Sequence, residues 1–155
     1  MFFFKSNYQR SKDIEKVKFP ISPYARELFL ALSQAKQHKQ RQQFSVDLVD
    51  ELCDLARIDI VNVKISEKKQ YHKKSGGRVV YKQYGYYRVA SKYIYINNRT
   101  AVRGQVLAAK TFLDTLLHEW MHHYDHKKLG LNSIHTSGFY ARLRDLKEKL
   151  GYFEL

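Results

Sequence analysis

The longest regular pattern in the chain is AKTFLDTLLHEWMHHY, residues 109–124. Its apolar residues recur every three or four positions, which is the period of one face of an α-helix. The full stripe comprises Val102, Val106, Ala109, Phe112 or Leu113, Leu116 or Leu117, Trp120 and Tyr124. Gly130, which follows Lys127 and Lys128, is typical of a helix end. The pattern predicts one long helix, buried along one side.

Inside this helix, His118-Glu119-Trp120-Met121-His122 has the form H-E-x-x-H. Residues four apart lie on one helix face, so the imidazoles of His118 and His122 can both reach a metal ion about 2 Å away. Glu119 projects beside them, where its carboxylate can take a proton from a water at the metal. We therefore predict a zinc (Zn2+) site with Glu119 as general base. The alternative is two surface histidines on a basic helix.

A catalytic zinc usually takes three protein ligands. We predict His135 as the third, because it lies in the polar segment 132–136 that follows the helix and can fold back over the metal. His126 lies about 12 Å along the helix axis from His118, and His123 is rotated about 100° from His122, so both should face elsewhere. Asp125 either supports a ligand by a hydrogen bond or pairs with a lysine. The alternative for His135 is a position beside a helix cap with no ligand role.

The rest of the chain predicts an α+β domain. We expect a strand or irregular segment over residues 1–20, a helix from Pro23 to about Gln40 capped by Ser22, and a short helix starting at Ser45. Strands are expected within 58–65, 79–81, 86–89 and 93–96, forming a short antiparallel or mixed sheet of about three strands in a meander. A polar loop should cover 68–77 and close on Gly76-Gly77, and the sheet should end at Asn97-Asn98. A final helix should start near Thr136 or Ser137 and end before Gly151.

Length and composition fit one soluble domain over residues 1–155, with 44% hydrophobic and 28% charged residues. The single cysteine, Cys53, excludes an intramolecular disulfide and a cysteine-built zinc finger. With no disulfide to form, a reducing cytoplasm is the simplest expected location. No apolar run is long enough to predict a membrane-spanning helix. The net charge of +13 favours an anionic partner, although it could serve solubility alone.

Between Lys64 and Lys92, basic residues and tyrosines alternate, and Glu67 is the one acidic residue. Basic side chains can follow phosphates while aromatic rings stack on bases, so this region is a candidate for binding single-stranded DNA. The candidate contacts are Lys68, Lys69, Lys73, Lys74, Arg78, Lys82, Arg88, Tyr84 and Tyr86. The alternative is that tyrosines favour strands and lysines fill solvent-facing positions. A strand edge near the metal could also bind an extended peptide.

The sequence resembles the SprT-like metallopeptidases, a family that includes the Spartan protease acting on DNA–protein crosslinks. The resemblance lies in TLLHEWMH, residues 115–122, in HTSGF, residues 135–139, and in the strand-like YIYIN, residues 93–97. It implies zinc ligation by His118, His122 and His135, a catalytic Glu119 and a zincin-like fold with helices packed on a short sheet. Family members commonly carry glycine after the third histidine, where this chain has Thr136.

Taken together, the residues and the resemblance predict a zinc endopeptidase that cleaves proteins, including those associated with DNA. Tyr140, Arg142 and Arg144 are interpreted as packing or solvent residues rather than as groups that stabilise an oxyanion. Two rival functions remain. One is a basic DNA-binding module with a structural zinc and little or no peptidase activity, and the other is a metallohydrolase of a non-peptide substrate.

Overall fold

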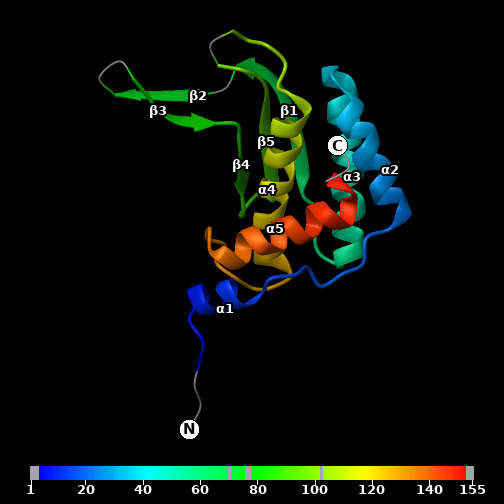
Figure 1. Ribbon diagram of the computed structural model, residues 1–155, viewed down its shortest axis with the longest axis vertical. Coiled ribbons are helices and arrows are strands. Elements are labelled where there is room, and N and C mark those ends of the chain that lie inside the picture. The colour runs from blue at the N-terminus through cyan, green and yellow to red at the C-terminus, as the bar shows by residue number, and fades with distance from the viewer. Residues whose placement is uncertain (1–3, 70, 76–77, 102, 153–155) are drawn as a thin grey trace.

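A three-stranded mixed sheet, with helices packed against one face, organises the protein in the computed structural model (Figure 1). The structure describes residues 4–69, 71–75, 78–101 and 103–152, and only the backbone of 69, 71–75 and 78–83. In chain order the elements are α1 Asn7–Asp13, α2 Pro23–Gln34, α3 His38–Ala56, β1 Asn62–Lys69, β2 Tyr71–Ser75, β3 Arg78–Gln83, β4 Gly85–Arg88, β5 Tyr93–Arg99, α4 Ala109–Lys127 and α5 Ser137–Leu150. The predicted α+β class is confirmed.

The sheet has the strand order β1-β5-β4, so that β5 pairs in parallel with β1 and antiparallel with β4. The expected mixed sheet of about three strands is present, but the predicted meander is wrong, because β3 pairs with β2 in a separate hairpin that projects away from the helices (Figure 1). Ile65, Ile94 and Ile96 are fully buried on the inner face of the sheet, where α3 and α4 pack. β4 lies at the edge of this sheet, next to α4.

The predicted polar loop over 68–77 is also wrong, because β1 continues to Lys69 and β2 covers Tyr71–Ser75. Residues 71–75 lack the alternation of a half-buried strand, so no strand was expected there, whereas the strand expected within 79–81 lies in β3. Gly76-Gly77, the predicted turn, lies outside the described residues. At the same end of the sheet, β5 runs past Asn97-Asn98 to Arg99, which pairs with Lys69 of β1.

The helix at Pro23 begins as predicted, with the Ser22 hydroxyl accepting a hydrogen bond from the Ala25 N–H. It ends at Gln34 rather than Gln40, and α3 begins at His38, well before Ser45. A buried polar residue in α3, Arg41, stabilises this break between the two helices. It is 1% exposed and donates to the Ala35 carbonyl and to Asn98 Oδ1. A search for apolar spacing passes over such a residue.

The expectation of a strand or irregular segment at the N-terminus is wrong as well, because Asn7–Asp13 forms α1. α1 lies against α5 (Figure 1). A Cβ at Gly138, in the first turn of α5, would overlap the carbonyl oxygen of Ser11 and lie 2.7 Å from that of Lys12. Glycine at 138 therefore permits the close approach of these two helices.

The long helix α4 starts at Ala109, later than the apolar stripe suggested. Val106 forms an isolated β-bridge with Arg99, and Val102 lies outside the described residues. Trp120, Tyr124 and Phe112 are fully buried in the core, as the stripe predicted. α5 begins and ends as predicted, between the Thr136 cap and Gly151. None of the helices in the described part of the chain is long and apolar enough to cross a membrane.

Candidate metal centre

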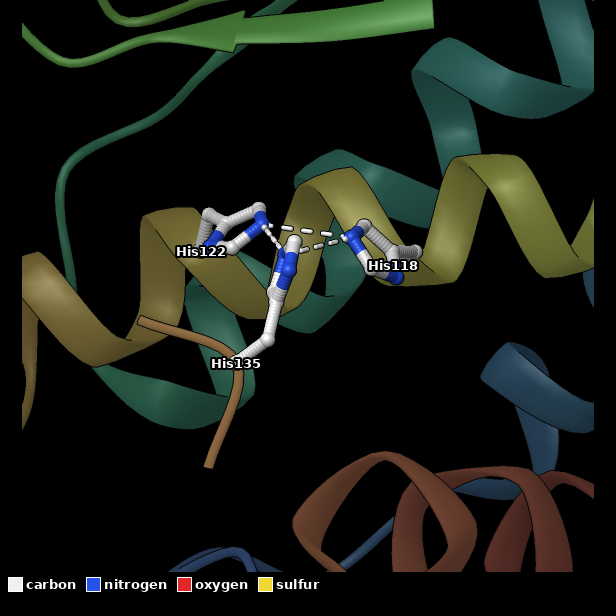
Figure 2. Close-up of side chains that lie close together, drawn as sticks. All are labelled: His118, His122 and His135. Carbon is white, nitrogen blue, oxygen red and sulfur yellow. Dashed lines mark hydrogen bonds between the residues drawn. The ribbon is translucent and has the colours of Figure 1, made fainter. Parts of the chain in front are cut away.

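Three imidazoles converge on one point, and each directs its Nε2 atom toward the other two (Figure 2). The Nε2 atoms lie 3.1 Å apart for His118 and His135, 3.3 Å for His118 and His122, and 3.0 Å for His122 and His135. His118 and His122 come from successive turns of α4, and His135 comes from the segment between α4 and α5. The structure thus brings together the three residues that the sequence singled out.

The nitrogen spacing fits a metal ion. A tetrahedral zinc bound to imidazoles at its usual bond length separates its ligand nitrogens by about 3.3–3.4 Å. The three separations of 3.0–3.3 Å are close to that value, so a point about 2 Å from all three nitrogens exists beside them. Of the described residues, His118, His122 and His135 alone form a cluster that could hold a metal ion.

The protonation state of the rings also suits a metal. Burial, followed by the nearby His135, lowers the pKa of His118 to about 4. Burial, followed by the other two histidines, lowers the pKa of His122 to about 3. Both rings are therefore neutral at physiological pH, and neutral imidazole is the form that binds metals.

Phe139 on α5 supports all three rings from one side. It is fully buried, and its ring centroid lies 5.1 Å from that of His118, 4.7 Å from that of His122 and 5.2 Å from that of His135. The Thr136 hydroxyl caps α5 by accepting from the Phe139 N–H, which fixes where the Phe139 side chain enters the site. Thr136, the departure from the family pattern, thus has a role as a helix cap.

Glu119 lies beside the histidines at a cavity of about 310 Å³. This cavity is bounded by Glu119, His122 and Ser133 on one side and by Gly85, Tyr87 and Val89 of β4 and the following turn on the other. Glu119 is only 8% exposed, and this burial raises the pKa of its carboxyl group to about 8. A cation at the three imidazoles would lower this pKa again, because positive charge favours the carboxylate.

The neighbouring histidines lie outside the cluster, as predicted. His123 is buried, with Nε2 donating to the Asp59 carbonyl and Nδ1 accepting from the Tyr87 hydroxyl at 2.8 Å. This link, which the sequence did not reveal, joins β4 to α4 at the wall of the cavity. His126 lines the cavity but belongs to no metal cluster of the described residues.

In the part of the chain that the structure describes, Asp125 pairs with Arg142 rather than with a lysine. Its carboxylate binds the Arg142 guanidinium and the Ser133 hydroxyl, and both Asp125 and Arg142 are fully buried. Arg142 is therefore a packing residue, as interpreted from the sequence. Tyr140 is 46% exposed with its ring centroid 5.9 Å from that of His135, and Arg144 is exposed.

Among the candidate DNA contacts, the structure describes the side chains of Lys68, Tyr84, Tyr86 and Arg88. Lys68 is exposed near the end of β1, and Tyr84 is partly buried against the core. Arg88 lies over the Tyr86 ring at the outer face of the sheet. The side chains of Lys69, Lys73, Lys74, Arg78 and Lys82 lie outside the described part of the structure.

The three imidazoles, Glu119 and the adjoining cavity form one candidate site. Comparison of the chain with family models, curated proteins and solved structures finds no match. Function is therefore inferred from the chemistry of these residues.

We predict that the protein binds one zinc ion and that His135→Ala weakens zinc binding by more than about 100-fold, since loss of a ligand should exceed the effect of losing a supporting residue. Competition with a chelator of known affinity measures the change. His126→Ala is the matched control, because His126 lines the same cavity without joining the cluster. Equal zinc affinity in the two variants would contradict the three-histidine site.

Proposed function

We propose that this protein is a zinc metallopeptidase with a zincin-like fold related to the SprT-like family. The observation that carries the proposal is the meeting of three imidazole nitrogens beside a carboxylate, Glu119, at an open cavity. The sequence resemblance supports it, since a strand precedes the motif helix and His135 precedes the helix that carries Phe139.

The roles of the chain's own groups follow from their placement. When bound, zinc would supply a Lewis acid that lowers the pKa of water and polarises a carbonyl. His118, His122 and His135 would hold it and leave a further position open on the cavity side. The Glu119 carboxylate would take a proton from the attacking water and pass it to the leaving amine.

The cavity's second wall favours an extended peptide as substrate. β4 is an edge strand of the sheet, and Tyr87 on it lines the cavity opposite Glu119. A peptide laid alongside an edge strand can gain main-chain hydrogen bonds while its carbonyls pass the site. This arrangement would suit a protease more than a hydrolase of small, compact substrates.

A purely structural zinc is the weaker alternative. Structural zinc sites usually have four protein ligands and need no adjacent base. Among the described residues, no fourth histidine, cysteine or carboxylate joins the three imidazoles. The buried position of Glu119 beside His118 would serve no purpose in such a site.

We also propose that the outer face of the sheet contacts single-stranded DNA. Tyr86 and Tyr95 are paired across β4 and β5 and stack with centroids 5.1 Å apart and planes 8° from parallel. The Arg88 guanidinium lies 4.9 Å from the centre of the Tyr86 ring, and Lys64 is the β1 partner of Tyr95. Lys64 and Arg88 are exposed. Stacked rings flanked by cations are suited to bases and phosphates.

We predict that Glu119→Gln keeps the zinc and the fold but lowers cleavage of an unfolded protein such as casein by about 10²–10⁴-fold, because the amide cannot accept the proton. Zinc content, circular dichroism and the cleavage rate should be measured on the same sample. The control is Glu148→Gln, on the exposed side of α5. Turnover like that of the parent protein in Glu119→Gln would reject the proposed mechanism.

For the sheet face, Lys64→Gln with Arg88→Gln should weaken binding of a single-stranded oligonucleotide and reduce the salt dependence of log K by about 1 to 1.5, because two phosphate contacts are lost. The control pair is Lys12→Gln with Arg144→Gln, which removes the same charge from exposed positions on α1 and α5. A titration at several salt concentrations gives both slopes. Equal slopes for the two double variants would argue against contact at this face.

A further inference from the structure

His122 is connected through hydrogen bonds to the most deeply buried ion pair among the described residues, Asp125–Arg142. Its Nδ1 atom lies 2.8 Å from the Ser133 hydroxyl oxygen, which in turn donates to Asp125 Oδ2 at 2.8 Å. Asp125 is held by Arg142, whose Nε and Nη2 bind its two oxygens at 3.0 and 2.8 Å. These hydrogen bonds lead from a predicted metal ligand into the core.

The direction of each hydrogen bond follows from the groups involved. A carboxylate only accepts, so the single Ser133 hydroxyl proton points to Asp125. The Ser133 oxygen is then left to accept a hydrogen bond, and His122 must supply the proton from Nδ1. With its proton on Nδ1, the neutral His122 ring carries its lone pair on Nε2. That is the atom directed at His118 and His135.

The segment that carries Ser133, between α4 and α5, is also hydrogen-bonded to α1. The Asn7 side chain accepts from the Asn132 N–H and donates to the Asn132 carbonyl, at 2.8 and 2.7 Å. Arg10 donates to the Leu129 carbonyl at 2.8 Å. The residue next to Asn132 is Ser133, so α1 restrains the backbone that positions the Ser133 hydroxyl.

We propose that Ser133 is a positioning residue of the metal centre, which orients His122 and fixes its metal-binding tautomer because Asp125 and Arg142 orient Ser133. The inference rests on the metal site of the proposed function and deepens it. It assigns a role to a buried ion pair that lies outside the H-E-x-x-H motif. Outer groups of this kind typically change metal affinity by about 10–100-fold.

The test is Ser133→Ala compared with Ser133→Thr, which keeps a hydroxyl, and with Ser137→Ala, an exposed neighbour outside the hydrogen-bonded chain. Ser133→Ala should weaken zinc binding by about 10–100-fold and shift the visible spectrum of the cobalt-substituted protein. Ser133→Thr and Ser137→Ala should resemble the parent. Affinities and spectra are recorded well below the melting temperature of each metal-free variant, because Ser133→Ala removes a hydrogen bond from the buried Asp125 and should lower that temperature.

Parental zinc affinity and an unchanged cobalt spectrum in Ser133→Ala would overturn the proposal. A lower melting temperature of metal-free Ser133→Ala with parental zinc affinity would show that the residue acts on stability alone, and would likewise overturn it. If the parent protein itself bound no zinc, the metal site of the proposed function would fail first, and this inference would fail with it. The parent measurement therefore separates the two failures.

Discussion

The arrangement of α1, α4 and α5 depends on the hydrogen bonds of one buried group, the Arg142 guanidinium. Its five N–H groups are all used, in bonds to both oxygens of Asp125, to the carbonyls of Ser11 and Ile14 and to the Ser11 hydroxyl. A buried charge is tolerated only when it is paired and fully hydrogen-bonded, and removing one partner typically costs about 3–5 kcal/mol. Arg142 thereby holds α1, α4 and α5 in one arrangement, and His135 lies in the segment between α4 and α5.

A second buried link fixes the opposite side of the site. His123 is bonded to Tyr87 of β4 and to the Asp59 carbonyl before β1, so the sheet edge cannot shift along α4 without breaking both bonds. The cavity therefore lies between two walls that are each anchored in the core. Anchored walls would hold a bound peptide in a fixed position relative to the three imidazoles and Glu119. Catalysis by positioning depends on such a fixed geometry.

Features with a local signal could be predicted from the sequence. Helix geometry relates His118 to His122, and Ser22 and Thr136 are each residue types that cap a helix. Their placement therefore needed no knowledge of the tertiary structure. His135 was predicted because it follows the motif helix in a short polar segment. The start of α3 and the whole of α1 were missed because they depend on Arg41, Ser11 and Gly138, whose contacts lie far away in the sequence. The strand order was missed for the same reason, since β1 pairs with β5 across the intervening hairpin.

The central claim is that three imidazoles hold one zinc ion at an open site. X-ray diffraction from crystals of the zinc-loaded protein, recorded at the zinc absorption edge, tests it most directly. We expect one anomalous peak about 2.0–2.1 Å from the Nε2 atoms of His118, His122 and His135, with no fourth protein ligand. A peak bound by other side chains, or three separated rings with no metal between them, would contradict the claim.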